Sequence, residues 1–177
     1  MSNIEVEIRS FITKEQFENL LEFFKTNATL DKTDYQETYY FDCEQDLRIQ
    51  KNNSGCKVWL KEGKIHDDHR KEIEIRLEGK DFEKLEDLFK SLGHGVQVKW
   101  FRERNQFDWN GIKVCLDYTK GYGYIIELEK MASEDNKQEI LLELKQRLKE
   151  LNVLETPKEE FKTKFDYYTN NWKSLTM

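Results

Sequence analysis

Several residue types that point to particular classes of protein are scarce in this sequence of 177 residues. Its three cysteines, Cys43, Cys56 and Cys115, lie far apart without a CxxC spacing, so they indicate neither a zinc knuckle nor a disulfide framework. No run approaches the ~18 apolar residues that a membrane-spanning helix needs, and the first residues form a charged stretch instead of an apolar signal segment. We therefore expect reduced thiols and a soluble cytoplasmic protein without a membrane partner.

A basic excess is also absent, because 29 Lys and Arg residues stand against 35 Asp and Glu residues, for a net charge of −6. Proteins that bind nucleic acid generally carry a basic excess that displaces counterions from phosphates, so we expect no nucleic-acid partner. The sequence does contain 37% hydrophobic and 36% charged residues. This composition supplies the core of a single domain, which we expect to span residues 1–177, and leaves many charges to be placed.

The stretch Ile4–Arg9 alternates strictly between aliphatic and charged residues. In a β-strand this alternation directs the three aliphatic side chains to one face and Glu5, Glu7 and Arg9 to the other. An ordinary half-buried strand with a solvated face explains such a stretch on its own. The same division recurs in residues 69–77 and 124–130, which adds a charged interior as a second interpretation.

Helices are expected where apolar residues recur at helical spacing, and strands where they alternate. Thr13 and Gln16 form a capping box before the first helix, and Asn110-Gly111 is a strong signal for a two-residue hairpin turn. The expected helices span about 14–26, 81–92, 134–151 and 157–172. The expected strands span about 4–9, 38–42, 47–51, 56–61, 69–77, 98–109, 112–117 and 124–130, with a polar connection between residues 27 and 37.

Eight strands without obvious parallel crossover units favour an α+β fold, namely an eight-stranded antiparallel β-barrel, or tunnel, with flanking helices. Closing the sheet would remove its edges. The alternative is an open sheet with helices on one side, which would leave the charged face of each strand in water.

Charged side chains of both signs recur on one face of successive strands, with Cys115 on the same face as Asp117. If these faces converge, glutamates two residues apart offer hard oxygen ligands for Mg²⁺ or Mn²⁺, while arginines and lysines offer donors for phosphate oxygens. A polyphosphate bridged by metal would be the natural ligand. The loop of residues 63–69, with His66 and His69, also admits a metal cluster, but a solvated loop is favoured.

The charged motifs occur in a specific order: Glu5-x-Glu7-x-Arg9, Tyr40-Phe41-Asp42, Leu47-Arg48, Leu60-Lys61, Arg70-x-Glu72-x-Glu74, Arg102-x-Arg104, and Leu116-Asp117 followed by Gly121 to Glu129. Their order and spacing resemble those of the CYTH superfamily, the triphosphate tunnel metalloenzymes. This superfamily includes class IV adenylate cyclases, thiamine triphosphatases and inorganic triphosphatases. The resemblance covers nearly the whole chain.

The resemblance implies a tunnel in which Mg²⁺ or Mn²⁺ is held, directly or through water, by Glu5, Glu7, Glu127 and Glu129. It implies phosphate binding by six basic residues: Arg9, Arg48, Lys61, Arg102, Arg104 and Lys162. Further charged residues would line the tunnel: Arg70, Glu72, Glu74 and Asp117. There are alternatives for each set. The acidic residues are then surface carboxylates, and the basic residues form ion pairs within the tunnel. Lys158 or Lys164 could also take the place of Lys162.

Lys61 and Tyr40 are the candidate catalytic residues, because together they would activate or orient a nucleophile, although a tyrosine that only packs explains Tyr40 equally well. The sequence departs from the family pattern at Gln50, where many members have arginine, and at Phe107, where an aromatic hydroxyl is common. These departures keep open the alternative of a non-catalytic module that binds nucleotide or polyphosphate.

The resemblance implies one of two reactions on a small-molecule triphosphate such as ATP, tripolyphosphate or thiamine triphosphate. A triphosphatase uses metal-activated water to attack the terminal phosphorus, whereas a class IV adenylate cyclase converts ATP to cyclic AMP and pyrophosphate. The sequence leaves open which of them this protein performs. The resemblance also implies a homodimer as one expected assembly, because proteins of this family are often dimers.

Overall fold

The computed structural model describes residues 4–61 and 72–177, which fold into two compact units. The first unit combines the residues up to Thr33 with Glu103–Tyr168, and the second combines Asp34–Arg102 with Thr169–Met177. Each unit is therefore assembled from segments that lie far apart in the sequence.

The described residues form eight strands: β1 (Ile4–Ile12), β2 (Thr29–Phe41), β3 (Asp46–Asn52), β4 (Gly55–Lys61), β5 (Glu72–Leu77), β6 (Val96–Trp109), β7 (Ile112–Thr119) and β8 (Gly123–Ala132). The α-helices of this part of the chain are α1 (Lys14–Asn27), α2 (Phe82–Ser91), α3 (Lys137–Glu150) and α4 (Lys158–Leu175). Hydrogen bonding orders the strands β1-β8-β7-β6-β2-β3-β4-β5. The pairs β1/β8, β7/β8, β2/β3, β3/β4 and β4/β5 are antiparallel, which confirms the expected eight-stranded antiparallel sheet with flanking helices. In the described residues this order ends at β1 and β5, so the sheet is not closed by hydrogen bonds there.

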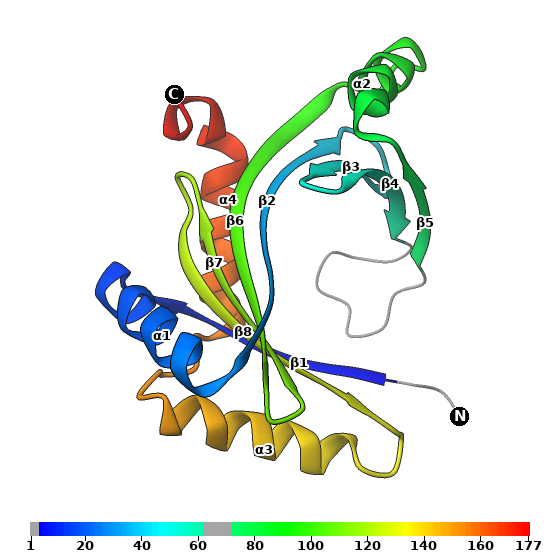
Figure 1. The fold of residues 1–177 in the computed structure, drawn as a ribbon. Coiled ribbons are helices and arrows are strands. Elements are labelled where there is room, and N and C mark those ends of the chain that lie inside the picture. Colours follow the sequence, from blue (N-terminus) through cyan, green and yellow to red (C-terminus); the bar gives the residue numbers. More distant parts are fainter. Residues whose placement is uncertain (1–3, 62–71) are drawn as a thin grey trace. The chain divides into compact units, whose positions relative to one another are not determined.

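In the first unit, α1 and α3 lie against β1 and β8 (Figure 1). Ile8 of β1, Leu128 of β8 and Leu144 of α3 are buried in one apolar cluster. Burial stabilises by about 25 cal/mol per Å² of apolar surface, so this cluster fixes which face of each strand meets the helices. Because side chains alternate along a strand, the opposite face of the same strands carries the charged residues.

The second unit has a smaller apolar cluster, in which α2 covers β3 and β4 (Figure 1). Phe82 of α2, Ile49 of β3 and Tyr39 of β2 are buried there. The adjacent strand residues Tyr40 and Arg48 therefore lie on the opposite, polar face.

Two local signals in the sequence form the structures that they predict. The Thr13 hydroxyl accepts a hydrogen bond from the Gln16 N–H, and the Gln16 side chain accepts one from the Thr13 N–H, which completes the capping box of α1. Between β6 and β7, Asn110 and Gly111 have φ angles of 55° and 78°. Positive φ at both positions is what the type I′ hairpin turn requires.

The expected polar connection between residues 27 and 37 is wrong, because β2 begins at Thr29. This stretch lacks the apolar alternation that marks a half-buried strand. It forms a strand because it pairs with β6, and side chains add to the pairing: Thr33 donates to Asn105 at 3.1 Å, and Gln106 donates to Asp31 at 3.3 Å. Cross-strand pairing thus overrides the local pattern.

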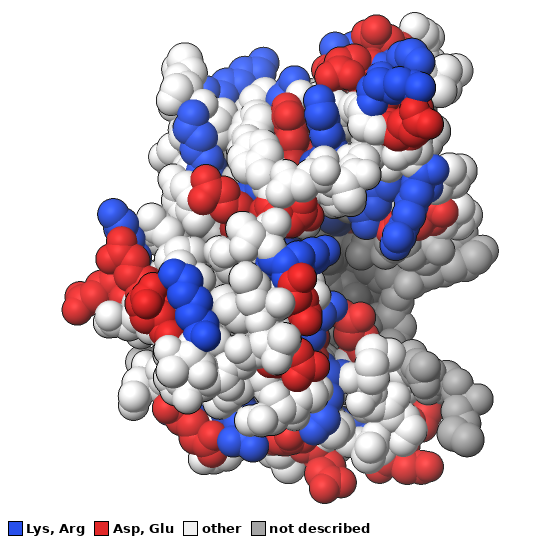
Figure 2. Space-filling view, in the orientation of Figure 1, with Lys and Arg blue, Asp and Glu red and all other residues white. Residues whose placement is uncertain are grey.

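Charges of both signs share the surface, and Figure 2 shows Lys and Arg interspersed with Asp and Glu on the visible face. Exposed pairs along a helix include Lys25 with Glu22 at 2.7 Å and Lys14 with Glu18 at 3.6 Å, both on α1. Exposed pairs of this kind contribute at most about 1 kcal/mol each. The charges that distinguish this protein are therefore the buried ones.

None of the helices in the described residues is both long and apolar enough to cross a membrane. All three cysteines are free thiols, and two of them are buried. Cys56 belongs to the apolar cluster of the second unit, whereas Cys115 lies on β7 opposite Glu127.

A buried hydroxyl on β1 fixes the segment that leads into α4. Ser10 is fully buried, and its Oγ lies 2.8 Å from Oγ1 of Thr156, accepts from the Thr156 N–H at 3.0 Å and donates to the Leu154 carbonyl. The Phe11 N–H in turn donates to the Thr156 hydroxyl at 3.0 Å. These bonds hold the start of α4 beside β1.

We predict that Ser10→Ala lowers the free energy of unfolding by about 1–3 kcal/mol, because it leaves buried polar groups without a partner. Urea denaturation followed by circular dichroism measures the change. Thr26→Ala is the control, since that hydroxyl only bonds the Glu22 carbonyl on an exposed helix face, and its effect should stay below about 0.5 kcal/mol. An equally small effect of Ser10→Ala would show that this link does not hold the segment.

Candidate functional site

The charged face of the first unit is built by β1, β8 and β7 in register. Two rows of cross-strand neighbours result: Glu7, Glu129 and Lys113 in one, and Arg9, Glu127 and Cys115 in the next. Directly opposed side chains on one face have Cβ atoms about 4.5–5.5 Å apart. The register therefore brings charged residues from near both ends of the sequence together.

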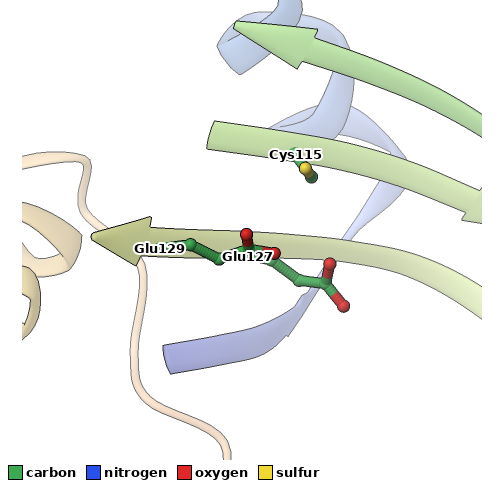
Figure 3. A group of neighbouring side chains, drawn as sticks. All are labelled: Cys115, Glu127 and Glu129. Atoms are coloured by element: carbon green, nitrogen blue, oxygen red, sulfur yellow. The ribbon is translucent and has the colours of Figure 1, made fainter. Parts of the chain in front are cut away.

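The four glutamates that the sequence predicts as metal ligands lie in two groups that share Glu129. One group contains Glu5, Glu7 and Glu129, and the other contains Glu127, Glu129 and Cys115. In each group, one potential ligand atom from each residue lies within 4.8 Å of the others. Figure 3 shows Glu127 and Glu129 projecting from β8 and Cys115 from the neighbouring β7. Each group thus offers three donors from two adjacent strands.

Arg104 of β6 compensates two buried carboxylates beside these groups. Its Nε and Nη2 donate to Asp117 at 2.8 and 2.6 Å, and Nη2 also donates to Glu127 at 2.5 Å. Asp117 is 1% exposed and Glu127 is 7% exposed. Burial alone would lower the pKa of Arg104, but Glu127 and Asp117 raise it well above its ordinary value. Arg104 therefore stays charged and fixes the Glu127 side chain.

Lys113 of β7 is a charged-face residue that the sequence analysis does not single out. Its ammonium contacts the buried Glu129 carboxylate. Burial alone would lower the pKa of Lys113, but the hydrogen bond to Glu129 raises it. The alternation that directs Cys115 and Asp117 to this face directs Lys113 there as well, so the signal is present in the sequence.

Burial shifts two of the glutamates toward their protonated form. The pKa of Glu129, which is 6% exposed, rises to about 7 because desolvation outweighs the contact with Lys113. Desolvation and the charge of Glu127 raise the pKa of Glu7 to about 7 as well. Glu7 keeps contact with water, which screens part of this shift.

Arg9 is held by an aromatic ring and not by a carboxylate. Its guanidinium carbon lies 4.6 Å from the ring centroid of Phe161 in α4. No hydrogen bond or ion pair engages Arg9 within residues 4–61 and 72–177. A cation–π contact orients a cation without neutralising it, so Arg9 keeps its donors for an anion.

The helix α4 directs Lys164 toward the charged face. The Lys164 ammonium lies 3.7 Å from the ring centroid of Phe11, which stacks on Phe161 at 4.4 Å. Residues three apart on a helix share a side, whereas Lys162 lies away from Phe161 around the helix and is exposed. The phosphate-binding role of Lys162 stays a prediction, and Lys164 is the lysine of α4 with a described contact to β1.

The polar face of the second unit has its own ion pairs. Arg48 forms a bidentate ion pair with Asp46, with both N···O distances at 2.6 Å, and its guanidinium carbon lies 4.3 Å from the ring centroid of Tyr40. Lys57 donates to Glu74 at 2.7 Å, and this hydrogen bond lowers the pKa of Glu74. A phosphate at Arg48 would therefore compete with Asp46, and Tyr40 packs beneath the guanidinium.

The remaining predicted site residues lie in the second unit or outside the described residues. Arg102 lies on β6 in the second unit, with its guanidinium carbon 5.9 Å from the ring centroid of Trp100. Arg70 and the loop of residues 63–69 lie outside the described residues, and Lys61 and Glu72 pair across β4 and β5 with their side chains undescribed. The catalytic partnership of Lys61 with Tyr40 stays a prediction.

The donor chemistry of the two acidic groups fits a divalent cation. Carboxylate oxygens are the ligands that Mg²⁺ and Mn²⁺ prefer in proteins. The buried Glu129, whose pKa is raised by desolvation, is common to both groups, so positive charge placed there would favour its ionised form. The strands that carry the groups hold the donors in fixed register.

The sequence and the fold resemble those of known proteins. The sequence profile of the CYTH domain matches residues 3–160. A protein of Methanocaldococcus jannaschii named "putative adenylate cyclase" is 32% identical over 133 residues, which cover 69% of this chain and 75% of that protein.

Solved structures share the fold. A conserved hypothetical protein of Pyrococcus furiosus is 26% identical, with a TM-score of 0.68 over 85% of this chain and 91% of its own. A Hippeastrum protein, described as a "putative adenylyl cyclase" with a dominant triphosphatase activity, is 20% identical, with a TM-score of 0.62 over 86% of this chain and 89% of its own. The CYTH profile covers most of the sequence, and the chain therefore belongs to the CYTH domain family.

Proposed function

We propose that this protein is a divalent-metal-dependent enzyme that hydrolyses triphosphates, with inorganic tripolyphosphate as the simplest substrate. The observation that carries the proposal is the convergence of four glutamates into two groups that share Glu129. Arg9, opposite Glu127, adds a cation that no ion pair engages within residues 4–61 and 72–177. Phosphoryl transfer depends mainly on positioning and charge neutralisation, and this site supplies acidic residues for metal beside a basic residue for phosphate. Mg²⁺ or Mn²⁺ is the expected cofactor.

Each residue of the first unit has a distinct role in this proposal. The two glutamate groups would hold metal, and a bound Mg²⁺ or Mn²⁺ polarises a phosphoryl oxygen and lowers the pKa of its water. Arg9 would bind substrate oxygens, and Phe161 would orient its guanidinium. Arg104 would hold the Glu127 side chain in place. In the reaction, a water oxygen bonds to the terminal phosphorus, the bridging P–O bond breaks, and orthophosphate leaves.

The aromatic rings near the basic residues support a polyphosphate ligand. In the first unit, Arg9 lies over Phe161 and Lys164 over Phe11. In the second unit, Arg48 lies over Tyr40, and the Lys57 ammonium lies 4.4 Å from the ring centroid of Trp59. Each ring thus has a cation on one face, so the rings hold positive charge for anionic oxygens and offer less surface for stacking a nucleobase.

Adenylate cyclase activity is the second candidate, and the name of the Methanocaldococcus relative favours it. In that reaction the 3′-hydroxyl of ATP would attack the α-phosphorus, and pyrophosphate would leave. The described triphosphatase activity of the Hippeastrum protein favours hydrolysis. A binding module without turnover is the remaining alternative.

We expect purified protein with Mg²⁺ or Mn²⁺ to release orthophosphate from tripolyphosphate. Separate incubations with tripolyphosphate, ATP and thiamine triphosphate, resolved by ion-exchange chromatography, identify the products. Cyclic AMP with pyrophosphate from ATP would instead assign the cyclase. Tight metal-dependent binding without any product would contradict both enzymes and favour the binding module.

We predict that Glu129→Gln lowers metal-dependent turnover by at least about a hundredfold, because both acidic groups lose their shared ligand. Residues that merely support metal ligands already cost about 10–100-fold when replaced. Glu139→Gln is the matched control, since Glu139 is exposed on α3 away from the charged face. Steady-state phosphate release measures both variants, and full activity of Glu129→Gln would remove the proposed metal site.

We predict that the affinity for Mn²⁺ rises with pH until about pH 7 and then levels off. The raised pKa of Glu129 means that a proton competes with the cation below about pH 7. Far enough below that pKa the affinity should change by about tenfold per pH unit for one displaced proton.

The raised pKa of Glu129 also affects the stability of the metal-free protein, whose free energy of unfolding should fall as the pH rises. A carboxyl whose pKa is higher in the folded state destabilises the fold as pH rises from about 4.5 to about 7. Calorimetric titration and urea denaturation measure the two slopes. Glu129→Gln should flatten both, and unchanged slopes in that variant would exclude Glu129 as the titrating group.

We predict that Phe161→Leu weakens tripolyphosphate binding by about two- to fivefold, since an exposed cation–π contact contributes ~0.5–1 kcal/mol. Arg9→Ala should weaken it further, and adding Phe161→Leu to that variant should change little, because the ring would act through Arg9. Isothermal titration of tripolyphosphate measures the cycle. Effects that multiply in the double variant would show that Phe161 acts independently of Arg9.

A further inference from the structure

The indole of Trp59 is a buried hydrogen-bond donor in the second unit that the proposed function does not use. Its neighbour Val58 packs against the apolar cluster of that unit, so Trp59 points to the opposite, polar face of β4. There it lies directly opposite Arg48 of β3 and Glu74 of β5, whose strands flank β4 (Figure 1). Trp59 is only 6% exposed, although both of these neighbours are charged.

The Trp59 N–H has no hydrogen-bond acceptor among residues 4–61 and 72–177. An indole nitrogen can only donate, and a buried donor without an acceptor costs free energy. Buried tryptophans therefore usually place this N–H on an acceptor. The group that is missing at Trp59 is an acceptor.

The carboxylate directly opposite Trp59 is already engaged on both of its oxygens. Glu74 accepts from Lys57 at 2.7 Å through one oxygen and from Arg76 at 2.7 Å through the other. Two cations thus share one negative charge. Positive charge is in excess beside the indole N–H, and this excess favours an anion as the missing acceptor.

Lys57 is the cation that lies closest to the ring. Its ammonium is 4.4 Å from the ring centroid of Trp59, compared with 5.7 Å for the guanidinium carbon of Arg48. Arg48 forms a bidentate pair with Asp46, whereas Lys57 shares its carboxylate with Arg76. The Lys57 side chain is 27% exposed, so an anion can reach this cation from solvent.

We propose that the Trp59 indole N–H and the Lys57 ammonium together bind a phosphoryl group of the substrate, which makes Trp59 a specificity-determining residue of an anion subsite in the second unit. The proposal rests on the proposed function, because a triphosphate supplies the phosphoryl group. One phosphoryl group presents several strong acceptor oxygens and so can accept from both donors. The flexible Lys57 stem moves with the anion onto the indole N–H, and Glu74 keeps its hydrogen bond from Arg76.

Trp172 offers a matched comparison within the second unit. Its indole N–H donates to the Gln97 carbonyl oxygen at 3.0 Å, so this donor already has its acceptor. An anion that binds at Trp59 should leave the Trp172 N–H unchanged.

The experiment titrates tripolyphosphate into ¹⁵N-labelled protein in metal-free buffer with EDTA, while NMR records the indole N–H resonances of the four tryptophans. We expect the Trp59 resonance to move downfield and saturate, as a new hydrogen bond requires, and the Trp172 resonance to stay in place. A Trp59 resonance that stays in place throughout the titration would overturn the proposal. So would an equal movement caused by sodium chloride at the same ionic strength.

The assignment of the resonance does not depend on how well Trp59→Phe folds. Replacing the other three tryptophans by phenylalanine, one at a time, identifies their resonances and leaves that of Trp59 by elimination. The titration itself uses the wild-type protein.

Trp59→Phe keeps an aromatic ring and removes the donor. We expect it to bind tripolyphosphate at least about tenfold more weakly by isothermal titration calorimetry, because hydrogen bonds to charged groups are among the stronger ones. Trp172→Phe should stay within about twofold of wild type. Wild-type affinity in a Trp59→Phe variant whose remaining indole resonances are unchanged would overturn the proposal.

These readouts do not depend on turnover. A saturable shift of the Trp59 resonance in a protein that hydrolyses no triphosphate would refute the proposed function alone. Metal-dependent hydrolysis of tripolyphosphate by a protein whose Trp59 resonance does not move would refute the role of Trp59 alone.

Discussion

The compensation of buried carboxylates by buried cations is the constraint on which the first unit depends. Asp117, Glu127 and Glu129 are nearly inaccessible to water, and an uncompensated charge in such a place costs several kcal/mol, comparable to the whole stability of a domain. Arg104 bridges Asp117 and Glu127, and Lys113 contacts Glu129. Strand alternation makes this arrangement necessary, because the apolar face of the same strands is committed to α1 and α3.

The cations do not compensate all of the buried carboxylates equally, and this difference relates the fold to the proposed chemistry. Arg104 has two carboxylates and remains charged, whereas Glu129 has a raised pKa despite Lys113. Glu5 and Glu7 extend the acidic set toward water. Positive charge from outside the chain would therefore stabilise this face. Arg9, held over Phe161, keeps its donors available at the same face. In the proposed function, a divalent cation and a polyphosphate together would satisfy both needs.

Much of this arrangement follows from period-two alternation, which the sequence displays directly. The alternation of Ile4–Arg9 places Glu7 and Arg9 on one face, and the hairpin signal Asn110-Gly111 forms the turn that it predicts. The strand character of residues 29–37 was not predictable from the local pattern, because pairing with β6 and not apolar alternation makes them a strand.

The partners of individual charges depend on register and on tertiary contacts, which a single sequence does not contain. The alternation places Asp117 on the charged face, but only the register brings Arg104 to it and Glu127 to Cys115. Likewise, three lysines near the start of α4 are equivalent in the sequence, and the docking of Phe161 on Phe11 decides that Lys164 contacts β1.

Crystals soaked in Mn²⁺ and measured at the manganese absorption edge test most directly whether the acidic groups hold metal. The account predicts an anomalous-difference peak within bonding distance of a Glu129 carboxylate oxygen, with further ligands from Glu5 and Glu7 or from Glu127. Saturating Mn²⁺ that leaves this position empty while the ion occupies other carboxylates of the protein would contradict the account.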